Sequence, residues 1–295
     1  MSDGTEDVAA LVKRLAIVTP DVVGGVPFII LDSVAALAAA IETLTVLALK
    51  HGGIAVDLEG VRLGRTGTIA TLQLCAEPRG TTYIVDVSTL GSAAFDDAAR
   101  LRGLLESSDI KKLFWDVRSD ANALFYHFDV AIPPRAVVDL QLLELASATA
   151  RGRNMPRLSG LGWLLDNTSH GGLSDDETLR MHDIKDAARR MFAPELGGSY
   201  AVWHERPLSP TLLEYATDCR YFHAIRDSLS SGLMRNPHID AALTDAMQRR
   251  IELAHSDAFR SDDREANVRV DSTLVEAVRG RVPGGAYTRR GRNRY

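Results

Sequence analysis

Residues 53–60 read Gly53-Ile54-Ala55-Val56-Asp57-Leu58-Glu59-Gly60, and this stretch decides which fold the chain is expected to adopt. The aliphatic run is typical of a buried strand, and Gly60 begins a turn. Because side chains alternate across a strand, Asp57 and Glu59 project from the same face. Two neighbouring carboxylates repel each other and are costly to desolvate, so the pair needs an explanation.

Two explanations of the Asp57 and Glu59 pair remain open from these residues alone. A strand end that runs into solvent keeps both carboxylates hydrated, and Asp-x-Glu is a common triplet. A divalent cation would also remove the repulsion, because hard cations are bound by carboxylate oxygens. The metal interpretation requires further acids to converge on the same edge of the sheet.

Two further strand-like runs, at residues 68–75 and 81–87, follow the first one at 53–58. The segments between the three runs are short and rich in Gly, Arg, Thr and Pro, which is typical of turns. Connections this short cannot hold a crossover helix, so the three strands are predicted to form an antiparallel meander.

Beyond the meander, helical and strand patterns alternate. We expect a helix at 93–106, a strand at 112–115, a helix at 119–128 and a strand at 136–138. This alternation predicts parallel pairing with right-handed crossovers. The expected fold class is therefore α/β: a mixed sheet flanked by helices, in which an antiparallel meander precedes parallel strands, with a helical C-terminal extension.

The remaining segments read as helix and tail. An N-capped helix is expected at 31–48, and from residue 139 onward the pattern is nearly all helical, including 207–231 and 238–258. Few large apolar residues follow, so most of the last segment is interpreted as a flexible extension. The expected parts are an N-terminal lead at 1–29, one domain at 30–232, a C-terminal helix at 233–258 and a basic, flexible tail at 259–295.

The composition of the 295 residues is that of an ordinary globular protein, with 45% hydrophobic and 25% charged residues. Cys75 and Cys219 are too few for a disulfide framework and form no short-spaced zinc motif, which favours a reducing compartment. The N-terminus lacks the pattern of a signal peptide, and no run of about 18 apolar residues without charge is present. We therefore expect an intracellular protein, in the cytoplasm or the nucleus, with no membrane partner.

The net charge of −5 argues against a generic nucleic-acid coat. This average hides an asymmetry, because residues 271–295 carry six Arg against Asp271 and Glu276, a local charge of +4 that leaves −9 for residues 1–270. The end of the chain, at 289–295, could contact phosphates and stack on bases, or it could simply be a solubilising end.

Further acids stand where they could join Asp57 at one edge of the sheet. Asp120 lies at the first turn of a predicted helix, where an acid also serves as a cap. Asp116 ends the preceding strand and is a rival for any functional role there. Asp139 lies between a strand and a helix and could be another cap.

The last candidate segment, at 205–221, contains Tyr215 and Asp218, which are three apart and therefore neighbours on a helix surface. A Tyr beside an Asp on a half-buried helix is otherwise a packing residue next to a solvated charge. Whether this pair is functional depends on the motifs in the rest of the chain.

The order of these motifs resembles the DEDD superfamily of 3′–5′ exonucleases, most of all the ribonuclease D-like branch and its fungal 3′–5′ exonuclease-domain relatives. Within about residues 30–232 stand Asp-x-Glu-Gly, Arg-Ser-Asp-Ala-x-Ala-Leu, Val-Asp-Leu-Gln, and Arg-Pro-Leu followed by Glu-Tyr-Ala and Asp. The resemblance implies a ribonuclease H-like sheet and two ions of Mg²⁺ or Mn²⁺ that activate water and stabilise the leaving oxygen. The resemblance implies that the metal ligands are Asp57, Glu59, Asp120 and Asp218. It also implies that Tyr215 is catalytic and orients the attacking water.

One spacing departs from the family pattern. The ribonuclease D-like motif separates Tyr and Asp by four, whereas Tyr215 and Asp218 are three apart, a rotation of about 100° on an ideal helix. If the helix is regular, Glu214 lies where the tyrosine belongs. If the helix is locally wound or shifted, Tyr215 stays over the metals. We expect the shifted helix, because Tyr215 keeps the Glu-Tyr-Ala context of the relatives.

The resemblance implies a metal-dependent 3′–5′ exonuclease that hydrolyses single-stranded RNA or DNA and releases nucleoside monophosphates. The alternative is a nuclease-fold module that has lost turnover and binds RNA or a protein partner. A structure that brings Asp218 to Asp57 favours the enzyme, and scattered acids favour the module.

Overall fold

A computed structural model describes residues 20–167, 174–231, 233 and 236–280. Its described strands form one seven-stranded sheet in the order β1-β2-β5-β4-β3-β6-β7. The strands are β1 (Asp21–Val23), β2 (Val26–Leu31), β3 (Ile54–Glu59), β4 (Thr71–Cys75), β5 (Thr82–Val85), β6 (Lys112–Phe114) and β7 (Val137–Asp139). Strands β3, β4 and β5 pair antiparallel, and β6 and β7 continue parallel to β3, so the predicted meander and parallel pairing are confirmed.

The α-helices are α2 (Val34–His51), α3 (Val87–Leu90), α4 (Leu101–Glu106), α5 (Arg118–Phe128), α6 (Leu140–Ala150), α7 (Leu161–Asn167), α8 (Asp175–Phe192), α9 (Pro210–Tyr215), α10 (Phe222–Ser231), α11 (Pro237–Ala254), α12 (Arg264–Asn267) and α13 (Ser272–Arg279). Short 3₁₀ turns are η1 (Gly91–Phe95), η2 (Asp97–Ala99), η3 (Pro134–Ala136), η5 (Pro194–Leu196), η6 (Tyr200–His204) and η7 (Asp218–Tyr221). Helices therefore flank a mixed sheet, as the sequence pattern predicted.

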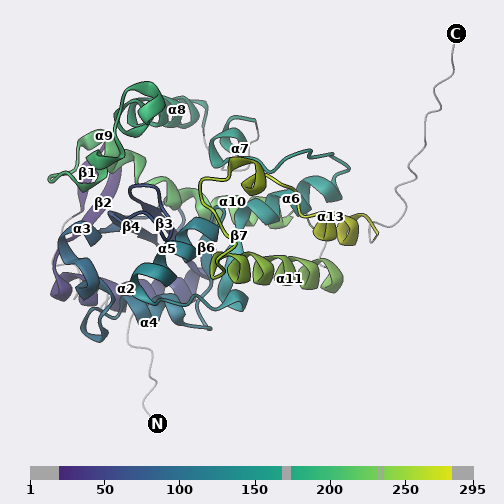
Figure 1. Ribbon diagram of the computed structural model, residues 1–295, viewed down its shortest axis with the longest axis horizontal. Helices are drawn as coiled ribbons and strands as arrows, with labels where there is room; N and C mark the ends of the chain where they lie inside the picture. The colour runs from purple at the N-terminus through teal and green to yellow at the C-terminus, as the bar shows by residue number, and fades with distance from the viewer. Residues whose placement is uncertain (1–19, 168–173, 232, 234–235, 281–295) are drawn as a thin grey trace, which may run out of the picture.

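The alternation of β3 divides the core into two faces. Ile54, Val56 and Leu58 are buried against α2, α4 and α5. Ala55 points the other way and shares a core with α6, α10, α11 and α13. Figure 1 shows α2 and α4 along one side of the sheet, with α6, α11 and α13 grouped on the side of β7. Asp57 and Glu59 have the parity of Ala55 and belong to the second face.

Helix α2 begins and ends at the residues that its sequence favours. The Ser33 side chain accepts a hydrogen bond from the Ala36 amide, and Gly52 takes the left-handed conformation (φ 73°) that ends the helix. By length and composition alone α2 could cross a bilayer. Because it buries Leu37, Leu44 and further residues against the sheet, it is a core helix of this domain.

Two of the predicted helices are broken in the structure. The single helix expected at 93–106 is wrong, since η1, η2 and α4 follow one another, and Arg100 interrupts them with a left-handed conformation (φ 62°). The helix expected at 207–231 is divided into α9, η7 and α10. Local apolar periodicity continued through both breaks, so it gave no sign of them.

Both ends of the described chain hold more structure than expected. The lead at 1–29 already contains β1, and β2 begins there and pairs parallel with β5. The flexible tail expected at 259–295 is wrong for 259–280, because Leu274 and Val278 of α13 are fully buried against α6 and α11. These two residues are four apart and so form one apolar face. Residues 281–295, with their arginines, lie outside the described residues.

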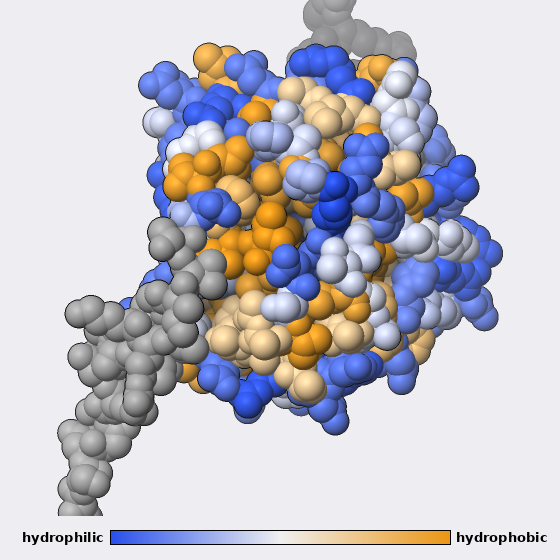
Figure 2. Space-filling view, turned by 90° about the vertical axis from the view of Figure 1, so that its left-hand side faces the viewer, coloured by the Kyte–Doolittle hydropathy of each residue, from blue (hydrophilic) through white to orange (hydrophobic). Residues whose placement is uncertain are grey.

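Strand β1 forms the edge of the sheet, and Val22 on it is 66% exposed. The side of the molecule on which β1 and β2 lie faces the viewer in Figure 2, where hydrophobic side chains gather near the middle with polar ones around them. Three consecutive segments, α8, η6 and α9, pack beside this edge through a third core that contains Trp203 and Leu212.

Candidate active site

The C-terminal end of β3 carries the first two acids. Asp57 and Glu59 are partly buried on one face of the strand, which confirms the alternation predicted from sequence. Their partners across the sheet are Gln73 and Thr71 of β4, whose side chains hydrogen-bond to each other at 2.6 Å. The acids therefore stand on a polar strip within an otherwise apolar sheet.

Asp120 comes from the first turn of α5 and is 6% exposed. The side chain caps nothing, because Val117 occupies the N-cap position and no side-chain cap bond is formed. No hydrogen bond to the Asp120 carboxylate is found within the described residues. A helix-cap role for Asp120 is therefore wrong, and its buried carboxylate calls for a partner of another kind.

The two rival acids have complete structural roles. Asp139 is fully buried and accepts hydrogen bonds from the Gln141 and Leu142 amides at the start of α6, so its predicted cap role is confirmed. Asp116 accepts hydrogen bonds from Nε and Nη2 of Arg118, both at 2.6 Å. Burial alone would raise the pKa of Asp116, but the charge of Arg250 and the bond from Arg118 hold it below its ordinary value. Asp116 is an ionised structural acid.

The spacing question at Tyr215 has a clear structural answer. Helix α9 ends at Tyr215, Ala216 and Thr217 leave the helix, and Asp218 starts the tighter η7. Tyr215 lies near the acids, since the ammonium group of Lys185 that pairs with Asp218 is 5.1 Å from its ring centre. Burial and then the charges of Glu59 and Asp218 raise the pKa of Tyr215 well above the ordinary value. The expected departure from a regular helix is confirmed.

Glu214 pairs with an arginine of α8, with no hydrogen bond to the acids of the sheet among the described residues. Its carboxylate accepts a hydrogen bond from Arg180 of α8 at 2.6 Å. The idea that Glu214 replaces the tyrosine is therefore not supported by its placement.

Turn η7 packs against β3, and the charges of the acids on β3, α5 and η7 act on one another. Burial and then the charge of Asp218 raise the pKa of Asp57 to about 7. Burial and then Asp57 raise the pKa of Glu59 well above its ordinary value. Asp120 behaves in the same way, with burial first and Asp57 second. The structure thus brings together the carboxylates that the motifs singled out.

Lys185 of α8 is the site residue that the sequence analysis missed. Its ammonium group forms an ion pair with Asp218 and lies 5.1 Å from the centre of the Tyr215 ring. Burial lowers its pKa, but the attraction of Asp218 and then Asp57 and Glu59 outweighs burial, so the pKa is raised. Lys185 belongs to no motif and lies 33 residues before Asp218, so no signal in the sequence marked it.

The residue types at this site fit divalent metal ions. Four carboxylates and one ammonium group leave a net negative charge, and hard cations take carboxylate oxygens as ligands. The buried Asp120 carboxylate, without a hydrogen-bond partner in the described chain, is the kind of donor that such an ion would satisfy. As they stand, no three Asp, Glu, His or Cys side chains of the described segments are arranged to hold one ion. Binding an ion therefore requires side-chain movement, first of all at the Lys185 and Asp218 pair.

A cavity of about 470 Å³ opens beside Asp218. Its lining combines charged and aromatic side chains, including Arg180, Arg220 and Tyr221, with the backbone of the β1–β2 turn at Gly24 and Gly25. The guanidinium groups of Arg220 and Arg79 lie 5.4 and 6.0 Å from the Tyr221 ring centre. Asp218 is thus reached from an open pocket whose walls carry charges of both signs and the Tyr221 ring.

The raised pKa of Asp57 predicts a pH-dependent stability in the metal-free protein. Between the ordinary value of 3.8 and about 7, the folded protein holds a proton that the unfolded chain releases, so stability is lost as the pH rises through about 7. Asp57→Asn removes this loss. Melting temperatures of the variant and of the unsubstituted protein are measured in chelator. The value for the variant minus that for the unsubstituted protein should increase as the pH rises from 3.8 to about 7. A difference that does not change with pH would contradict the shift.

Comparisons with known proteins agree with this geometry. A family model described as 3′–5′ exonuclease matches residues 29–234. Among curated proteins, none matches. The structure of Trypanosoma brucei RNase D with GMP is 25% identical over 90% of this chain and 74% of that chain, with a TM-score of 0.66.

Two other solved structures show the same fold at lower identity. Trypanosoma brucei RNase D with RNA U12 is 23% identical over 92% of this chain and 82% of that chain, with a TM-score of 0.60. Escherichia coli RNase D is 18% identical over 78% of this chain and 51% of that chain, with a TM-score of 0.51. The resemblance and the ribonuclease H-like fold class expected from sequence are confirmed.

Proposed function

This chain belongs to the DEDD family of 3′–5′ exonucleases and is an exonuclease that acts on nucleic acid, and on that premise we propose that it degrades single-stranded RNA from the 3′ end. The RNA and GMP complexes of Trypanosoma brucei RNase D support RNA over DNA as the substrate. The free, buried thiols of Cys75 and Cys219 support an intracellular setting, in the cytoplasm or the nucleus.

The proposed active site consists of Asp57, Glu59, Asp120, Tyr215 and Asp218. The observation that carries it is the packing of η7 against β3, which brings Asp218 to the strand of Asp57 and Glu59, while the charge of Asp57 acts on the buried Asp120 of α5. The family is generally dependent on divalent metal, and we propose two ions of Mg²⁺ or Mn²⁺ held by the four carboxylates. Two such ions supply, when bound, an activated water and charge stabilisation at the scissile phosphate.

The protein itself contributes orientation and charge to this reaction. Trp203 and Phe192 hold the Tyr215 ring, with ring centres 5.9 and 5.5 Å away. Since the Tyr215 pKa is raised, the phenol keeps its proton and can hydrogen-bond to an attacking water. Lys185 adds positive charge beside Asp218, where the phosphate must approach.

A degradation assay tests the proposal. Single-stranded RNA and DNA of one sequence, labelled at the 5′ end, are incubated with Mg²⁺, with Mn²⁺ and with chelator. We expect a ladder shortened from the 3′ end and release of nucleoside monophosphates, faster on RNA and absent in chelator. Faster digestion of DNA would overturn the choice of RNA, and full activity in chelator would overturn the metal site.

Tyr215→Phe should lower the turnover rate by roughly 10- to 100-fold while the affinity for substrate stays unchanged, because the lost hydroxyl acts mainly in the transition state. Steady-state rates over a range of substrate concentrations separate the two effects. Glu214→Gln is the matched control, since its carboxylate pairs with Arg180 and should leave turnover nearly unchanged. The opposite pattern, an inactive Glu214→Gln beside a silent Tyr215→Phe, would assign the role to the glutamate.

A further inference from the structure

The segment between α6 and α7 forms a basic surface on an acidic protein. Arg151, Arg153 and Arg157 are all exposed, and residues 145–165 contain no Asp or Glu. Residues 1–270 as a whole carry a net charge of −9. A local cluster of three guanidinium groups in such a body attracts phosphate where the average surface repels it.

An aromatic ring lies beside one of these arginines, Arg153. Trp163 of α7 is 43% exposed, whereas Trp203 is fully buried. The guanidinium group of Arg153 lies 5.8 Å from the centre of the Trp163 ring, a cation–π arrangement. A half-exposed indole next to guanidinium groups is the pairing on which single-stranded bases stack while phosphates are neutralised.

The backbone under this surface is fixed by hydrogen bonds. The Leu158 amide donates to the Val268 carbonyl at 2.9 Å, and the Gln141 side chain donates to the Ser159 carbonyl at 2.8 Å. The Arg153 amide donates to the Ala148 carbonyl at 2.9 Å. The arginines therefore stand on an anchored segment, which lowers the entropy cost of binding a ligand.

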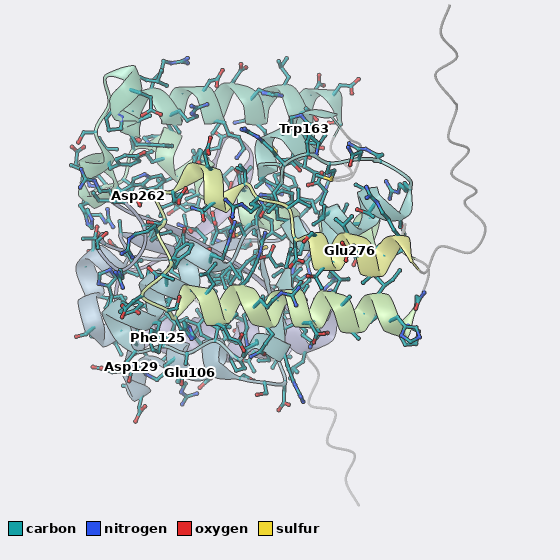
Figure 3. The ribbon with its side chains drawn as sticks, turned by 45° about the vertical axis from the view of Figure 1, so that its right-hand side comes forward. Glu106, Phe125, Asp129, Trp163, Asp262 and Glu276 are labelled. Carbon is teal, nitrogen blue, oxygen red and sulfur yellow. The ribbon has the colours of Figure 1, made fainter. Side chains whose placement is uncertain are left out.

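The surface lies within reach of the proposed active site through α8. Helix α7 contacts α8, and α8 carries both Lys185 and Arg180, the latter in the wall of the cavity beside Asp218. Figure 3 places Trp163 in the upper part of the molecule, beside α8. A strand whose 3′ end enters the cavity can thus continue over α7.

We propose that Arg151, Arg153, Arg157 and Trp163 bind the part of a single-stranded nucleic acid that lies 5′ of the nucleotides in the active site. Guanidinium groups contact the phosphates, and one base stacks on the Trp163 ring. This proposal rests on the proposed function, since it concerns the same substrate. It makes the enzyme more effective on long strands than on short ones.

Binding in chelator tests the surface without any reaction. Labelled oligonucleotides of about 4 and about 16 nucleotides are used, because these lengths span the usual size of one single-strand binding site. Their affinities are measured by fluorescence anisotropy at several salt concentrations. Trp163→Ala should weaken binding of the long strand by roughly 5- to 100-fold, the range for one lost base–aromatic stack, and leave the short one unchanged. Arg153→Gln should lower the log–log salt slope for the long strand by about 0.7.

Matched variants control for the loss of a charge, for the loss of an apolar side chain and for correct folding. Arg190→Gln on α8 removes an equally exposed guanidinium group, and Leu49→Ala on α2 removes an exposed apolar side chain that is 59% accessible. Both should bind the long strand normally. Trp163→Phe keeps a stacking ring and should retain most of the affinity that Trp163→Ala loses.

Two results would overturn the surface. Unchanged binding of the long strand by both Trp163→Ala and Arg153→Gln would show that this face does not bind the strand. An equal loss for short and long strands would place these residues in the active site instead. If the unsubstituted protein degrades no strand in Mg²⁺, the proposed function fails. The binding measurements in chelator can still be interpreted in that case.

Discussion

Replacing Asp120 by asparagine is expected to lower the rate of nucleic-acid degradation by about 10³-fold or more and to leave the folded protein at least as stable as before. The loss of rate follows because a metal site of four carboxylates loses a ligand and several kcal/mol of charge stabilisation in the transition state. The retained stability follows because burial and repulsion from Asp57 already disfavour the Asp120 carboxylate in the folded state. Turnover at saturating substrate and denaturant unfolding measure the two effects.

Asp116→Asn provides the matched control four residues earlier. It removes a carboxylate that pairs with Arg118 and Arg250, so the free energy of unfolding should fall while turnover per folded molecule is nearly unchanged. Because the pKa of Asp116 is lowered on folding, this contribution is present above its ordinary value of 3.8 and is lost as the pH falls below it. An inactive Asp116→Asn beside an active Asp120→Asn would show that the second acid of the site has been misassigned.

Arg250→Met is expected to lower the free energy of unfolding by about 3 to 5 kcal/mol, the usual cost of removing one partner from a buried ion pair. Arg250 of α11 donates to Asp139 at 2.5 Å and to Gln141 at 2.8 Å, and Asp139 is fully buried. The substitution leaves that carboxylate with backbone partners alone. Chemical denaturation followed by circular dichroism gives the value.

Arg249→Met is the control at the neighbouring position. Its exposed guanidinium group pairs with Asp271 at 2.8 Å, and surface pairs contribute about 0 to 1 kcal/mol. Adding Asp139→Asn to Arg250→Met should recover part of the lost stability, because the unpaired charge is gone. Equal small losses in both single variants would mean that α11 is not held to the sheet through this buried network.

The central sheet could be predicted from sequence because its signals are local. Turns shorter than a helix force β3, β4 and β5 into a meander, and strict alternation fixes the face of Asp57 and Glu59. The broken helices at 93–106 and 207–231 could not be predicted in this way. Their interruptions at Arg100 and at Ala216 depend on packing between distant segments, which the apolar period does not record.

The acids of the candidate site were found through the order of their motifs, but their surroundings were not. Lys185 reaches Asp218 only because α8 crosses the end of the sheet, and nothing near Lys185 in the sequence distinguishes it from other helical lysines. The segment 151–163 was overlooked for a different reason. A net charge summed over the body hides three exposed arginines in this segment, one of which, Arg153, lies over the Trp163 ring.

The packing of α13 has a consequence for the order in which the nuclease is made. Leu274 and Val278 complete the same core as Ala55 and Leu113, on the face of the sheet to which Asp57 and Glu59 belong. A chain growing on a ribosome at about 5 to 20 residues per second has synthesised Asp218 about 3 to 12 seconds before residue 278. During that interval every acid of the site has been translated, yet the core behind it is still open. The core on this face of the nuclease is therefore completed only after translation has passed α13.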